Sequence, residues 1–169
     1  MLEDVGEAYL NALGRAVFAF ARLEARAVET CERIDPGSMR SLAGRTAGNV
    51  ADRLCNLAET MEPSRDTSEL LATARTFSRL VRLRNAIVHA KPGRDEEGGA
   101  ILVHEGDPWM RAEFDEASRQ FDDCAARLAA LLDGFLDEPA PGEPEVAADF
   151  DPIDRDELFD RPRRERRRR

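Results

Sequence analysis

The chain has 169 residues, of which 42% are apolar and 35% are charged, and its formal net charge is -9 at pH 7. This length suits one domain with a buried core, the composition is typical of a soluble globular protein, and no apolar stretch approaches the about 20 residues of a membrane-spanning helix. The first residues, MLEDVGEAYLNALGR, carry acids where a secretory signal carries basic residues. We therefore expect a cytoplasmic protein with no membrane segment.

Apolar residues at helical spacing predict four long helices, over residues 3–33, 39–61, 66–89 and 110–136. The first two connections are short, which favours antiparallel neighbours. The sequence therefore predicts an all-α fold, a four-helix up-and-down bundle that spans residues 1–136.

The third connection, residues 90–109, is longer than the other two and contains the β-prone run AILVH. We expect a small hairpin or an edge strand there, with Trp109 closing the end of the bundle. His104 belongs to this run. It is either an ordinary surface residue or a second catalytic or substrate-contacting group.

Residues 137–169 form a second region, an acidic segment followed by an arginine run. Residues 137–160 hold ten acids and one arginine, and residues 161–169 hold seven arginines and one glutamate. Few groups could be buried, so we expect disorder. A docking motif near Phe150 or over Asp156–Phe159 is the alternative to a plain linker.

The C-terminal arginine run has two interpretations. It could hold RNA electrostatically, or it could fold back on the acidic segment, as a self-screening tail that holds RNA off or recruits an acidic partner. Its possible RNA-binding residues are Arg161, Arg163, Arg164, Arg166, Arg167, Arg168 and Arg169. The preceding residues, 1–136, are mildly acidic, so they predict no general nucleic-acid footprint.

The cysteines Cys31, Cys55 and Cys124 are widely separated and lie on or beside apolar faces. This pattern favours small buried thiols over a redox or metal site. No set of Cys, His and carboxylate residues has convincing ligand spacing. We expect no metal and no other cofactor.

The third predicted helix contains a charge on its apolar face. Arg84 falls beside Phe77 and Leu80, where an unpaired charge would be costly. In the first helix, Glu24 also falls on the core-facing side. We therefore expect a buried or half-buried contact between Glu24 and Arg84.

Asn85 and His89 are four residues apart, so they share one face of the same helix, and Asn85 can hydrogen-bond the His89 ring. His89 lies at the helix end, just before Lys91, where a helix C-terminus favours an imidazolium ion. An arginine beside an oriented histidine at an open end favours a phosphate site.

The run Arg84-Asn85-Ala86-Ile87-Val88-His89 resembles the motif of HEPN domains, the helical-bundle ribonucleases of toxin–antitoxin, abortive-infection and related phage-defence systems. The run Phe20-Ala21-Arg22-Leu23-Glu24 in the first helix is also similar to such proteins. The resemblance covers residues 1–136.

The resemblance implies a homodimer in which the motif helices of two subunits form one cleft. Arg84 would bind the scissile phosphate, Asn85 would fix the tautomer of His89, and His89 would act as general base or acid. The RNA 2′-hydroxyl would attack without a metal, which leaves a 2′,3′-cyclic phosphate and a 5′-hydroxyl. Lys91 could contact the RNA, and an antitoxin or sensor protein would be a further partner.

Two other interpretations stay open. One is a noncatalytic HEPN-like interaction or regulatory module, in which Arg84 is structural and only neutralises Glu24. The other is an unrelated function on a helical bundle.

Overall fold

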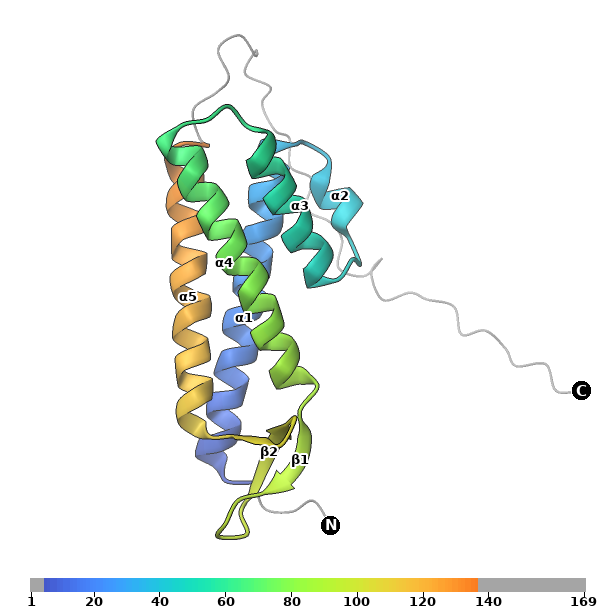
Figure 1. Ribbon diagram of the computed structural model, residues 1–169, viewed down its shortest axis with the longest axis vertical. Coiled ribbons are helices and arrows are strands. Elements are labelled where there is room, and N and C mark those ends of the chain that lie inside the picture. The colour runs from blue at the N-terminus through green and yellow to red at the C-terminus, as the bar shows by residue number, and fades with distance from the viewer. Residues whose placement is uncertain (1–4, 137–169) are drawn as a thin grey trace, which may run out of the picture. The chain divides into compact units, whose positions relative to one another are not determined.

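The computed structural model describes residues 5–136 and is mostly helical (Figure 1). The predictions for residues 137–169, including the docking motif and the arginine run, lie outside this range. The described helices are α1 (Glu7–Ile34), α2 (Ser38–Leu42), α3 (Ala47–Thr60), α4 (Arg65–Val88) and α5 (Arg111–Asp133). Three strands lie between the last two helices, β1 (Lys91–Arg94), β2 (Ala100–His104) and β3 (Asp107–Trp109).

The helix directions differ from the predicted up-and-down order. Arg15 pairs with Asp115, and Arg22 pairs with Asp122, so the residue numbers rise together along α1 and α5, and these two helices are parallel. Figure 1 shows α4 running in the opposite direction, with α3 beside it. Since α3 is antiparallel to α4, α3 is parallel to α1.

The cause is a break in the predicted second helix. Ala43 has an extended backbone, and Gly44 has a φ of 71°, a left-handed conformation that glycine adopts at little cost. The Thr46 side chain then accepts a hydrogen bond from the backbone N–H of Asn49, at 3.3 Å, and starts a new helix. The chain therefore reverses once in α2 and again before α3.

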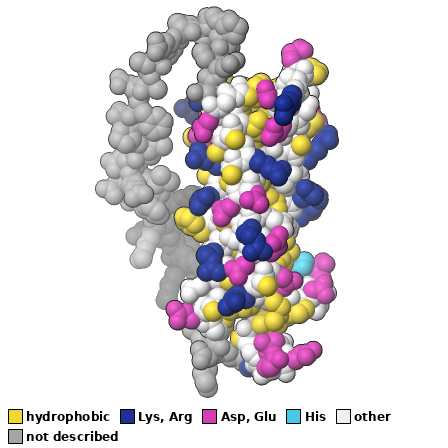
Figure 2. All heavy atoms as spheres, turned by 90° about the vertical axis from the view of Figure 1, so that its left-hand side faces the viewer, with side chains coloured by type: hydrophobic (Ala, Val, Ile, Leu, Met, Phe, Trp, Pro, Cys, Tyr) yellow, Lys and Arg dark blue, Asp and Glu magenta, His cyan; other side chains and the backbone are white. Residues whose placement is uncertain are grey.

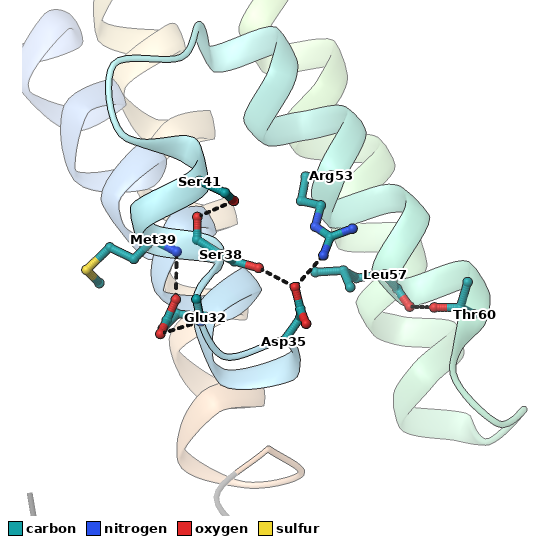
Figure 3. A network of polar contacts seen from close by, with 9 residues as sticks. Glu32, Asp35, Ser38, Met39, Ser41, Arg53, Leu57 and Thr60 are labelled. Carbon is teal, nitrogen blue, oxygen red and sulfur yellow. Dashed lines mark hydrogen bonds and ion pairs between the residues drawn. The ribbon is translucent and has the colours of Figure 1, made fainter.

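A polar network holds this reversal in place (Figure 3). The Glu32 carboxylate accepts hydrogen bonds from the backbone N–H groups of Gly37, at 2.9 Å, and Met39, at 2.6 Å. The Asp35 carboxylate accepts from the Ser38 hydroxyl, at 2.9 Å, and from the guanidinium of Arg53 on α3. Two carboxylates thus join the end of α1 to both following helices.

These contacts predict acid-sensitive stability. Hydrogen bonds to backbone N–H groups lower the pKa of Glu32, and those from Ser38 and Arg53 lower the pKa of Asp35. A lowered pKa contributes stability above the unfolded value, which is lost as the pH falls through the folded value. We expect the double variant Glu32→Gln/Asp35→Asn to melt below wild type at neutral pH, and the gap to close below about pH 4.

Circular dichroism melting curves at a series of pH values measure this gap. Glu62→Gln is the matched control, because Glu62 is an exposed acid just after α3. A gap between the double variant and wild type that stays constant from neutral to acid pH would contradict the assignment.

Aromatic side chains fill the centre of the bundle. The Phe20 ring of α1 stacks on Phe77 of α4, with centroids 6.3 Å apart, and meets Phe121 of α5 edge-on at 5.2 Å. All three are at most 3% exposed. Burial raises the pKa of the thiols of Cys31 and Cys124 to about 11, so both stay protonated, while Cys55 is half-buried.

Trp109 closes the end of the bundle at which α1 begins, as the sequence predicts (Figure 1). Trp109 is half-buried and stacks on Phe114, with ring centroids 5.5 Å apart. The Tyr9 hydroxyl donates to the backbone oxygen of Trp109, at 2.9 Å, and accepts from the N–H of Leu102, at 2.7 Å. These bonds attach the strands to α1.

The expected hairpin is a three-stranded antiparallel sheet in the order β1-β2-β3. Lys91 pairs with Val103 between the first two strands, and His104 pairs with Asp107 between the last two. The turn between β2 and β3 consists of Glu105 and Gly106, whose φ angles of 54° and 98° are typical of a tight type I′ hairpin. No helix within residues 5–136 is long and apolar enough to cross a membrane.

Candidate functional site

The C-terminal end of α4 carries the predicted motif. The helix ends at Val88, and His89 is its C-cap, whose backbone N–H donates to the carbonyl oxygen of Asn85 at 2.9 Å. Arg84 and Asn85 are half-buried, and His89 is exposed. The imidazole is therefore open to a ligand, while the arginine and the asparagine lie closer to the core.

Arg84 points inward, as the helical pattern predicts. Its guanidinium lies over the Phe20 ring, 4.7 Å from the centroid, and Nη1 donates to the Asn85 side-chain oxygen at 3.0 Å. A cation over an aromatic face gains about 0.5–2 kcal/mol, depending on how far it is desolvated. The ring and the amide therefore contact the guanidinium from two sides of the site.

The expected contact between Glu24 and Arg84 is not formed as an ion pair. Among residues 5–136, no hydrogen bond or ion pair joins the two side chains, and Glu24 is half-buried. Glu24 lies four residues beyond Phe20 on α1, about 6 Å further along the axis. Arg84 contacts α1 at the level of Phe20, so an aromatic ring replaces the predicted carboxylate.

The predicted contact between Asn85 and His89 is also missing. The Asn85 oxygen accepts from Arg84, and within the described residues no hydrogen bond joins the Asn85 and His89 side chains. The two residues share a helix face, but the neighbouring guanidinium competes for the same oxygen and is a charged donor. Asn85 therefore orients Arg84 in this structure.

His89 lines a surface depression of about 630 Å³ at the junction of α4 with the sheet. Lys91, His104 and Glu105 line the same depression. Arg84 and Asn85 are not part of its lining. The structure thus divides the predicted site into an Arg84–Asn85 pair on Phe20 and a two-histidine depression beside it.

Two functional candidates are clearer in the structure than in the sequence. Phe20 belongs to the run in the first helix that resembles the family, and no local signal marks it as the support of Arg84. The position of His104 beside His89 depends on the register of β1 with β2, which the pattern of AILVH alone does not determine.

The charge pattern of the described surface is mixed. Figure 2 shows one face, on which basic and acidic side chains alternate and do not gather into a basic patch. Several of the arginines are paired with carboxylates, such as Arg15 with Asp115 and Arg119 with Glu116. An anion site on this face would therefore be local.

No group of His, Cys, Asp and Glu residues within the described range is arranged to hold a metal ion. Comparison with known proteins found no match to a family model, to a curated protein or to a solved structure, so the arrangement of the side chains is the basis for assigning a function.

Proposed function

We propose that this protein is a metal-independent endoribonuclease of the HEPN type that cleaves RNA by attack of the 2′-hydroxyl and serves as a toxin or phage-defence effector. One observation carries the proposal. Arg84 is a half-buried cation that no carboxylate in residues 5–136 neutralises, and its guanidinium contacts the Phe20 ring and the Asn85 side chain.

This geometry suits the binding of a phosphate. A guanidinium has five N–H donors, and the bond to Asn85 uses one of them. The remaining donors form a planar fork that matches two phosphate oxygens. Arg84 would bind the scissile phosphate and stabilise the charge that develops on it in the transition state.

His89 supplies the proton transfer in this proposal. It is exposed at the C-cap, five residues after Arg84, where its imidazole can reach a ligand. Removal of the 2′-hydroxyl proton and delivery of a proton to the leaving 5′-oxygen are typical tasks of histidine. Lys91, in the same depression, would contribute positive charge toward the RNA backbone.

A second copy of the chain would complete the site. The 14-residue α3 leaves much of the 24-residue α4 uncovered. Leu10 and Val17 share one face of α1 and are 49% and 47% exposed, and Val88 on α4 is 53% exposed. Exposed apolar side chains favour association with a second copy, and Val88 lies on the motif helix itself. A homodimer through the motif helix would bring Arg84 of one subunit toward His89 of the other.

Other partners belong to the same proposal. The arginines of residues 161–169 would attract RNA with strong salt dependence, and an antitoxin or sensor protein would restrain the activity.

The test is cleavage of a mixed RNA pool in EDTA by wild type and by His89→Ala. Wild type is expected to leave 2′,3′-cyclic phosphate ends, and the variant is expected to lose about 10²–10⁴-fold in rate, the usual contribution of a general acid or base. End-group analysis and gel quantification measure both results. Arg40→Ala, an exposed substitution on α2, controls for changes in charge.

The alternative is a noncatalytic interaction module, and one observation favours it. Within one protomer, Arg84 and Asn85 do not line the depression that contains His89. A folded dimer that leaves the RNA pool intact would support this alternative over the ribonuclease.

A further inference from the structure

The two histidines of the chain line one depression, although fifteen residues separate them in the sequence. His89 caps α4, and β1 begins two residues later at Lys91. Lys91 pairs with Val103, the residue before His104, so the antiparallel register places the end of β2 beside the end of α4 (Figure 1).

The strand geometry fixes the position of His104. Side chains alternate between the faces of a strand, so His104 lies on the same face as Leu102, which packs against the bundle core. The tight Glu105-Gly106 turn follows His104 directly. A Cβ atom built on Gly93 would lie 2.6 Å from a methyl group of Val103, so the Val103 side chain occupies the space above Gly93.

Neither imidazole is held by another side chain in the described part of the chain. Within residues 5–136, no hydrogen bond or ion pair engages the side chain of either histidine. His89 is exposed, and His104 is half-buried. The charged residues nearest to them in the fold are Lys91 and Glu105, which line the same depression, and Asp107, which pairs with His104 on β3.

We propose that His104 is the second proton-transfer residue of the ribonuclease, paired with His89 within one protomer. This inference rests on the proposed function and adds to it a catalytic residue outside the motif. The depression would take an RNA phosphodiester, with the Lys91 ammonium near a phosphate oxygen.

The proposed step balances with two histidines. The neutral imidazole of one takes the proton of the 2′-hydroxyl as the 2′-oxygen forms a bond to phosphorus. The imidazolium of the other gives its proton to the 5′-oxygen as the bond between phosphorus and that oxygen breaks. The products are a cyclic phosphate and a 5′-hydroxyl, and the protonation states of the pair are exchanged.

The test compares wild type with His104→Ala and with His104→Gln, which keeps the bulk of the side chain if the smaller residue impairs folding. Both variants are expected to lose about 10²–10⁴-fold in kcat, with a smaller change in KM. The kcat of wild type is expected to fall at both ends of the pH range, and the variants are expected to lose one of the two limbs. Added imidazole should restore part of the cleavage by His104→Ala, which it would not do for a structural defect.

The outcomes separate the two proposals. Wild-type cleavage with both variants at the wild-type rate and with an unchanged pH profile would overturn the role of His104 and leave the ribonuclease intact. Restored cleavage in a mixture of His89→Ala and His104→Ala would overturn the pairing within one protomer, because only a pair from two subunits could then be complete. Absence of cleavage by wild type would overturn the proposed function and this inference together.

Discussion

Replacing Arg84 with Ala is expected to lower kcat/KM for RNA cleavage by about 10²–10³-fold, the usual cost of removing one donor from a developing oxyanion. The reason is that its guanidinium is held over Phe20 and beside Asn85 with no carboxylate partner in the described part of the chain. A cation that no carboxylate of residues 5–136 neutralises keeps its charge for a ligand.

Three variants test separately the positive charge of Arg84, the planar shape of its guanidinium and the contact with the Phe20 ring. Arg84→Lys keeps the charge but loses the planar fork, so it is expected to stay well below wild type. Phe20→Leu removes the ring and keeps an apolar side chain, so the guanidinium stays but loses its orientation, and an intermediate loss is expected. Arg82→Ala, an exposed arginine on the same helix, is the matched control and is expected to cleave like wild type.

Steady-state cleavage rates and urea unfolding curves of the same variants show whether Arg84 acts in catalysis or only stabilises the fold. Wild-type rates in Arg84→Ala combined with a lower free energy of unfolding would contradict the phosphate role. They would instead identify Arg84 as a structural residue of the bundle, which is the noncatalytic alternative.

The sequence predicts the long helices to within a few residues at most ends. The third predicted helix, residues 66–89, corresponds to α4 (Arg65–Val88), because apolar spacing and a capping residue mark a long amphipathic helix well. The second prediction joins α2 and α3, because the left-handed turn at Gly44 leaves the apolar spacing on both sides intact.

The sequence predicts which way the Arg84 side chain points, but it does not predict which residues that side chain contacts. A helical pattern gives the angle at which Arg84 points, and the structure confirms that it points inward. It does not give the level at which two helices meet, so Glu24 was expected where Phe20 lies. The residues near His104 depend on the register between β1 and β2. A local sequence pattern does not determine that register.

Phe77→Ala is expected to cost about 3–5 kcal/mol of the free energy of unfolding, the range for truncating a buried phenylalanine. Phe77 is 0% exposed and stacks on Phe20, so its removal leaves a cavity at the centre of the bundle. A domain of this kind has about 5–15 kcal/mol in total, so the loss is a large share of its stability.

Phe18→Ala is the matched control for this prediction, because Phe18 is the same residue type on α1 but is 67% exposed. It is expected to change the free energy of unfolding by less than about 0.5 kcal/mol. Urea unfolding followed by circular dichroism measures the free energy of unfolding of both variants.

Because Phe20 contacts both Phe77 and Arg84, Phe77→Ala is also expected to loosen the guanidinium of Arg84. It is therefore expected to lower RNA cleavage in the protein that remains folded. Equal stability of the two variants would contradict the central aromatic packing on which the orientation of Arg84 depends.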